Sequence, residues 1–166
     1  MHLNVIWIAA TQKDFVQARA LFEEYAAWLD VDLCFQGFAQ ELATLPGSYA
    51  QPLGCLLLAS PKAPADAATG CIALRPIDVD GMPAASVAEV KRLYVQPAAR
   101  RTGTGARLAQ RLVDEARSIG YRELKLDTLD WMTDARALYA RFGFRECAPY
   151  YHNPLPGVVY MALTLV

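Results

Sequence analysis

Cysteine and histidine are scarce in this sequence, which has four cysteines and two histidines among 166 residues. Cys34, Cys55, Cys71 and Cys147 lie far apart and form no Cys-x-x-Cys pair. That spacing argues against a disulfide framework and against a structural zinc site. We therefore expect neither a bound metal ion nor a disulfide-stabilised fold.

Long apolar runs and a strong net charge are also missing. No stretch approaches the roughly 20 apolar residues that cross a membrane, and no basic segment precedes an apolar one at the N-terminus, so we predict no signal peptide. The net charge is -1, which argues against a bulk electrostatic attraction to nucleic acid or to membranes. We expect a cytoplasmic protein with neither nucleic acid nor a membrane as its partner.

What the chain does have is apolar residues in sufficient number for a core. Hydrophobic residues make up 54% of it and charged residues 20%, typical of a globular protein. No repeat, linker or low-complexity segment interrupts the sequence, so we predict a single domain over residues 1–166. The charges are unevenly distributed, because 10 of the 17 acidic residues lie within residues 1–90 and 12 of the 16 basic residues lie within 91–166.

The spacing of apolar residues predicts a mixed α/β chain. Side chains that recur at helical spacing predict four helices, and short apolar or alternating runs between glycine and proline predict seven strands. The expected helices run from Thr11 or Asp14 to Leu29 and over residues 35–45, 105–119 and 133–142. The expected strands cover residues 5–8, 54–60, 70–77, 87–95, 123–128, 144–147 and 158–165.

One segment has the composition of an anion-binding turn. It reads Arg100-Arg101-Thr102-Gly103-Thr104-Gly105, between a predicted strand and a predicted helix. Glycine lets the backbone approach a ligand closely, the free N–H groups of a helix N-terminus attract phosphate, and arginine binds phosphate oxygens in pairs. The segment lacks the Gly-Lys-Ser/Thr of a Walker loop and the Gly-x-Gly-x-x-Gly of a dinucleotide fold. Taken alone, it is also compatible with a basic surface turn.

The surrounding motifs resemble those of the GNAT superfamily of acetyl-CoA-dependent N-acetyltransferases. A strand that contains Glu89 and ends in Leu-Tyr-Val-Gln-Pro precedes the Arg-x-x-Gly-x-Gly turn, and Ala135-x-x-Leu-Tyr-x-x-x-Gly-Phe144 follows one helix and one strand later. The resemblance is strongest from Glu89 to Phe144, about a third of the chain. One departure is Met132, where relatives often have asparagine; Thr133 or Asp134 could supply the polar contact instead.

The resemblance implies a fold and a cosubstrate. The fold is a mixed, mostly antiparallel sheet of about seven strands flanked by about four helices, with acetyl-CoA bound where the fourth and fifth strands separate. The backbone of the fourth strand would contact the pantetheine arm, the N–H groups from Arg101 to Ala106 would hold the pyrophosphate, and the two arginines would reach other phosphates. The expected cofactor-binding residues are Leu93, Tyr94, Val95, Arg100, Arg101, Thr102, Gly103, Thr104, Gly105, Ala106 and Tyr139.

Tyr139 matches the tyrosine that, in many relatives, donates to the coenzyme A sulfur as it leaves. A thiol has a pKa near ~8.5 and an unperturbed tyrosine near ~10, so a tyrosine hydroxyl can serve as a general acid here. The structural alternative is a helix tyrosine that packs on the sheet. We expect Tyr139 to be catalytic.

Glu89 is the expected general base, because relatives often place a carboxylate on this strand. Strand alternation puts Glu89, Lys91, Leu93 and Val95 on one face, and Val90, Arg92 and Tyr94 on the other. Glu89 could instead pair with Lys91 or Arg75, and Asp127 or a bound water could take its catalytic role.

The acceptor is the least defined part of the prediction. In the GNAT arrangement the first two helices and the loop before the last strand shape its pocket, which here gives Tyr25, Trp28 and Tyr150 as substrate-binding residues, with Arg75 and Lys91 from the sheet. Taken singly, Trp28 is better explained as a core residue of an amphipathic helix. Small amines, amino acids, drugs and protein N-termini all remain possible acceptors.

We predict direct transfer of an acetyl group from acetyl-CoA to a primary amine. An acetyl-enzyme on Cys71 or Cys147 is the less favoured route, because buried cysteines are usually unreactive. The alternative function is a non-catalytic acyl-CoA-binding regulatory module, and ATP binding is a third, weaker one. The apolar last strand could form a homodimer if it lies at a sheet edge.

Overall fold

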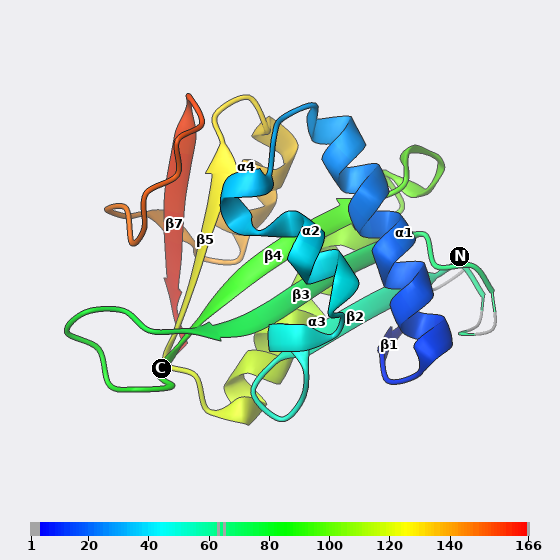
Figure 1. Ribbon diagram of the computed structural model, residues 1–166, viewed down its shortest axis with the longest axis horizontal. Helices are drawn as coiled ribbons and strands as arrows, with labels where there is room; N and C mark the ends of the chain where they lie inside the picture. The colour runs from blue at the N-terminus through cyan, green and yellow to red at the C-terminus, as the bar shows by residue number, and fades with distance from the viewer. Residues whose placement is uncertain (1–3, 63, 65, 166) are drawn as a thin grey trace.

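A single seven-stranded sheet organises the molecule (Figure 1). The computed structural model describes residues 4–62, 64 and 66–165. Spatial order in the sheet is β1-β2-β3-β4-β5-β7-β6, and every neighbouring pair is antiparallel except β4 and β5. The strands are β1 (Val5–Ile8), β2 (Cys55–Ser60), β3 (Gly70–Ile77), β4 (Val87–Val95), β5 (Glu123–Leu129), β6 (Arg145–Glu146) and β7 (Val158–Thr164).

Helices cover both faces of this sheet (Figure 1). On one face, α1 packs through Ala18, Leu21 and Phe22. On the other, α3 contributes Leu108 and Leu112 to the larger core cluster. The helices are α1 (Gln12–Leu29), α2 (Phe38–Ala43), α3 (Thr104–Ile119) and α4 (Thr133–Arg141), with short 3-10 turns at Cys34–Gln36, Gly47–Tyr49 and Pro97–Ala99.

The start of α1 shows why the sequence pattern located it correctly. The Thr11 hydroxyl accepts from the Asp14 backbone N–H, and the Asp14 carboxylate accepts from the Thr11 N–H, which forms a reciprocal capping box. The helix predicted over residues 35–45 is wrong in part. Gly37 adopts a left-handed φ of 68° and divides it into a 3-10 turn and α2.

The parallel pair β4 and β5 is the feature that opens the sheet. The two strands pair only at Val87–Glu89 with Glu123–Lys125. Further along, β4 contains a bulge against β3: Cys71 faces Tyr94 and Ala73 faces Lys91, with Arg92 at a φ of 62°. A bulge bends its strand and redirects side chains. β4 therefore separates from β5 over its second half.

The bulge also overturns the predicted alternation along β4. Arg92 lies on the same face as Lys91, because its guanidinium pairs with Glu41 of α2 while Lys91 contacts Gln36. Leu93 and Val95 instead pack against the α3 core cluster. The extra residue interrupts the alternation of side chains along β4, so the side chains beyond it lie on the opposite face from the one predicted.

The last strand, β7, does not lie at the edge of the sheet, which was the condition for a homodimer formed through it. β7 is not at the edge, because it lies between β5 and β6, and β6 pairs with Ala162 and Met161. The apolar strand is thus used inside the sheet. No helix in the described part of the chain combines the length and the apolar content of a membrane span.

Candidate active site

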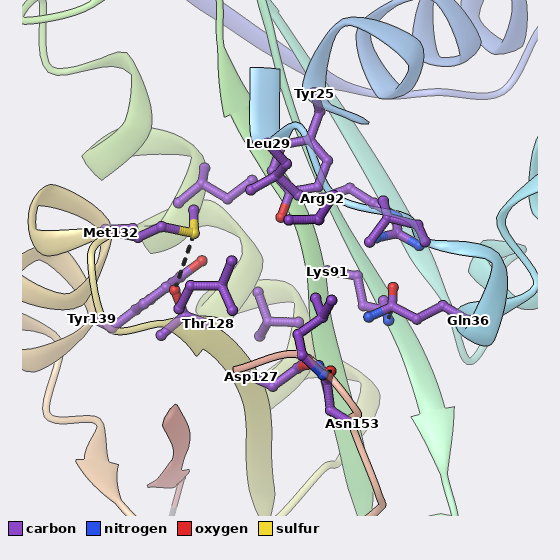
Figure 2. A pocket seen from close by; sticks show the side chains of 17 residues that line it. Tyr25, Leu29, Gln36, Lys91, Arg92, Asp127, Thr128, Met132, Tyr139 and Asn153 are labelled. Atoms are coloured by element: carbon purple, nitrogen blue, oxygen red, sulfur yellow. Dashed lines mark hydrogen bonds between the residues drawn. The ribbon is translucent and has the colours of Figure 1, made fainter. Parts of the chain in front are cut away.

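The separation of β4 and β5 creates the pocket shown in Figure 2. Its cavity volume is about 60 Å³. Apolar side chains from the end of α1 and from α4 form part of its wall, and the polar groups come from the strands and two loops. The lining residues include Tyr25, Leu29, Gln36, Val90, Lys91, Arg92, Leu93, Asp127, Thr128, Met132, Ala135, Tyr139 and Asn153.

Tyr139 reaches this pocket from α4. Its side chain is buried, with 7% of the residue exposed, and its ring lies against Phe144 with centroids 5.5 Å apart. Burial, assisted by the nearby Tyr25 and Asp127, raises the pKa of the Tyr139 hydroxyl well above its usual range. The hydroxyl therefore keeps its proton at neutral pH and can act only as a donor of it.

Glu89 is buried beside the pocket, in an ion cluster of its own. Arg75 donates to its Oε1 at 2.8 Å, the Tyr150 hydroxyl donates to Oε2 at 2.5 Å, and the Lys91 ammonium lies 3.7 Å from Oε1. Burial opposes ionisation, but the charges of Lys91 and Arg75 with the Tyr150 hydrogen bond hold the pKa of Glu89 below its usual value. The same contacts lower the proton affinity of this carboxylate. The structure thus gives Glu89 the ion-pair arrangement that the sequence offered as its alternative role.

Lys91 is the cation of this region that has no carboxylate within hydrogen-bond distance among the described residues. Its side chain is 4% exposed, and its Nζ donates to Gln36 Oε1 at 3.1 Å. Burial outweighs the attraction of Glu89 and lowers the pKa of Lys91 to about 8. A group with this pKa is still largely protonated at pH 7.

Asp127 is the carboxylate that lines the pocket itself. Tyr151 donates to its Oδ2 at 2.5 Å and Asn153 Nδ2 donates to the same atom at 2.7 Å. No residue in the described part of the chain donates to Oδ1. Figure 2 shows Asp127 and Asn153 together, near Lys91 and Gln36. Asp127 was only an alternative in the sequence, while Gln36 and Asn153 carry no motif there and become visible through the fold.

The predicted acceptor residues are divided between the pocket and its surroundings. Tyr25 and Lys91 line the pocket, whereas Arg75 and Tyr150 contact Glu89 behind it. Trp28 lies outside the lining, is 40% exposed and packs on Trp131 with ring centroids 5.5 Å apart.

The N-terminus of α3 has the geometry that the anion-binding turn predicted. No side chain caps it, in contrast to α1, and Gly103 before it has a φ of 81° with no atom within 4 Å of the position a Cβ would take. Arg107 is the first residue whose N–H bonds back, to the Gly103 carbonyl at 3.0 Å. The N–H groups of Thr104, Gly105 and Ala106 are therefore available to an anion.

The side chains of the turn contribute less than predicted. The Thr104 hydroxyl is buried and pairs with Thr102 at 2.7 Å, and Thr102 also donates to the Ala99 carbonyl. Arg101 has a φ of 62° and is exposed. These residues would hold a phosphate through the backbone, with Arg101 as an exposed cation beside it.

Arg100 and Tyr94 are directed elsewhere in this structure. The Arg100 guanidinium lies over the rings of Trp28 and Tyr94, at 5.1 and 5.7 Å, and its Nε donates to the Val95 carbonyl at 2.9 Å. The Tyr94 side chain packs in the α1 cluster. Any contact of Tyr94 with a cofactor would use its backbone.

Two sulfur-containing side chains named in the sequence analysis have defined surroundings in the structure. Cys71 is buried, and burial raises the pKa of its thiol, which donates to the Arg92 carbonyl at 3.3 Å. Met132 lines the pocket and accepts from the Thr128 hydroxyl at 3.6 Å, so a thioether stands where relatives often have an amide.

Among the described residues, no cluster of His, Cys, Asp and Glu could hold a metal ion.

Comparison with known proteins decides the family. Residues 24–144 match the model of the acetyltransferase (GNAT) family. The chain belongs to the GNAT family. It is 37% identical to an uncharacterised N-acetyltransferase from Schizosaccharomyces pombe over 153 residues, which cover 92% of this chain and 90% of that protein.

Solved structures agree on the fold of this GNAT protein. A GNAT-family acetyltransferase from Staphylococcus aureus superposes with a TM-score of 0.76 at 17% identity, covering 99% of this chain and 100% of that one. A Salmonella typhimurium protein solved with its cofactor acetyl-CoA gives a TM-score of 0.70 at 22% identity, covering 98% and 94%. The seven-stranded, mostly antiparallel sheet with four helices is thus the family fold, and the chain is an acetyltransferase.

Proposed function

We propose that this GNAT acetyltransferase moves the acetyl group of acetyl-CoA directly to a primary amine. One observation carries the proposal: the uncapped N-terminus of α3 lies beside the end of β4 and beside α4, since a Cβ on Gly105 would meet Val95 and Leu138, and the next residue of α4, Tyr139, lines the pocket where β4 and β5 separate. An anion-binding helix end and a proton donor on one opening suit a phosphate-bearing thioester.

The cosubstrate fits the residues that are present. The N–H groups of Thr104, Gly105 and Ala106 would hold its diphosphate, and the β4 edge beyond Glu89, which lacks a partner strand among the described residues, would bind an amide-containing arm. When bound, acetyl-CoA supplies an activated acetyl thioester. Positioning this group beside the amine accounts for much of the expected rate.

The proton steps use two pocket residues. Tyr139 donates its hydroxyl proton to the departing sulfur as the carbon–sulfur bond breaks and the carbon–nitrogen bond forms. Asp127 accepts the proton that the amine releases, either directly or through a water, and returns a proton to the tyrosine. For an amine that enters neutral, the net change moves one proton from nitrogen to sulfur; an ammonium first releases one further proton, which passes to solvent. We favour Asp127 over Glu89 for this step because Asp127 lines the pocket, whereas Glu89 lies outside the lining and contacts Arg75 and Lys91.

The test separates an enzyme from a binding module. Thermal unfolding with acetyl-CoA, coenzyme A, ATP and NADH should show stabilisation by the two coenzymes alone, about 2.7 kcal/mol at a 100-fold excess over Kd. Coenzyme A release with a panel of amines should then fall about 100-fold in Tyr139→Phe while stabilisation by acetyl-CoA persists. Binding without release by the wild type would support the regulatory module instead. No stabilisation by either coenzyme would contradict the whole proposal.

A further inference from the structure

The charged side chains in the pocket and beside it are unequally neutralised. Arg92 makes a bidentate contact with Glu41, at 2.8 and 2.9 Å, so this pair is complete. Arg75 and Glu89 form a second close pair at 2.7 Å. Of the three cations, Lys91 alone lacks a carboxylate within hydrogen-bond distance among the described residues, since Glu89 is 3.7 Å away.

This ammonium is almost fully buried and carries three N–H donors. One of them reaches Gln36 Oε1, and the side chain forms part of the pocket wall. A buried cation is costly unless it is paired and hydrogen-bonded. Lys91 has a long ion pair with Glu89, at 3.7 Å, and one hydrogen bond, so among the described residues it keeps N–H donors for an anion that enters the pocket.

Asp127 supplies the opposite charge to the same pocket, with one oxygen bonded to Tyr151 and Asn153. A pocket that has an ammonium and a carboxylate in its lining complements a zwitterion. The cavity of about 60 Å³ is small, which favours a small zwitterion.

We propose that the acceptor is a small free amino acid, whose carboxylate binds Lys91 and whose amine faces Asp127. The inference rests on the proposed acetyl transfer and narrows its substrate class. Gln36 has a positioning role, because its amide links Lys91 to the Tyr151 hydroxyl, which it approaches at 3.4 Å.

The test compares amino acids with their amides, which differ only at the carboxyl group. L-alanine and L-leucine are assayed beside L-alaninamide and L-leucinamide by coenzyme A release. A carboxylate raises the pKa of the neighbouring amine, so intrinsic reactivity favours the amides. We expect the acids to have a kcat/KM at least about tenfold higher in the wild type, because a charge-assisted contact is lost in the amide.

Lys91→Met should shift this acid-to-amide ratio toward the amides by about tenfold or more. Lys125→Met is the matched control. Lys125, like Lys91, is a lysine on a strand, but it does not line the pocket and has a close carboxylate partner, Glu123 at 2.6 Å. Its ratio should equal that of the wild type. The wild-type comparison decides the question even if Lys91→Met does not fold.

Each other outcome has a separate meaning. Faster reaction of the amides in the wild type overturns the inference. If 3-methylbutylamine is acetylated while neither amino acid is, the amino acid assignment fails and the proposed acetyl transfer stands. If no amine in the set releases coenzyme A, both fail together.

Discussion

At the scale of single residues, the two carboxylates near the pocket have different surroundings and therefore different expected roles. Asp127→Asn should lower kcat about 100-fold at pH 7, because an amide cannot accept the amine proton. Asp114→Asn, on the exposed surface of α3, is the control and should retain the wild-type rate. Steady-state kinetics with one amine acceptor would measure both. Wild-type kcat in Asp127→Asn, with a large loss in Glu89→Gln, would assign the base to Glu89.

The residue scale also shows what the sequence could and could not predict. Tyr139 was identifiable because a motif fixes its place on α4, and it does line the pocket. Gln36 and Asn153 were not, since each belongs to a loop without a motif and reaches the pocket only through chain folding. The pairing of Glu89 was offered as an alternative, but the sequence held no means of choosing it.

At the scale of elements, the start of α3 allows stability to be separated from binding. Gly103→Ala should lower stability by about 1 kcal/mol, because a φ of 81° is strained for a residue with a Cβ, and Tm should fall by about 2–4 °C. Gly105→Ala should not lower Tm, since its Cβ would meet Leu138 and Val95 at ordinary distances of 3.8 and 3.9 Å.

Acetyl-CoA binding should be weakened more by Gly105→Ala than by Gly103→Ala, the reverse of their effects on stability. The methyl group of Gly105→Ala would lie between β4 and α4, beside the free N–H groups, so stabilisation by acetyl-CoA should be smaller than in the wild type. The Cβ of Gly103→Ala has open space around it, so this variant should retain more of the stabilisation by acetyl-CoA. Thermal unfolding with and without acetyl-CoA measures both effects. Equal stabilisation of Gly105→Ala and wild type would place the cofactor elsewhere.

The sequence predicted the boundaries of most elements closely, but it did not always predict which face of the sheet a side chain lies on. β3 and β4 begin and end where alternation and glycine placed them. The bulge at Arg92 was invisible, because a period of two continues through a sequence whether or not the strand contains an extra residue. That bulge separates β4 from β5, so the element that forms the site was the one that pattern analysis could not resolve.

At the scale of the whole molecule, the buried ion cluster of Glu89 links stability to pH. The pKa of Glu89 is lowered in the folded state, so its contribution is fully present above the unfolded value of 4.5 and is lost as pH falls through the folded pKa. Glu89→Gln leaves Arg75 and Lys91 without that carboxylate and should cost about 3 kcal/mol at pH 7, or about 6–12 °C in Tm.

The difference between wild type and Glu89→Gln should therefore shrink as the pH is lowered below 4.5. Glu115→Gln is the control, because its pair with Arg111 is a surface contact within α3 and should be worth less than about 1 kcal/mol at any pH. Asp14, whose pKa is also lowered, is present in all three proteins and contributes the same slope to each. Thermal unfolding from pH 3 to pH 7 measures the three curves. Parallel curves for wild type and Glu89→Gln would show that the pKa of Glu89 is the same in the folded and unfolded states, and would contradict the stabilising ion cluster.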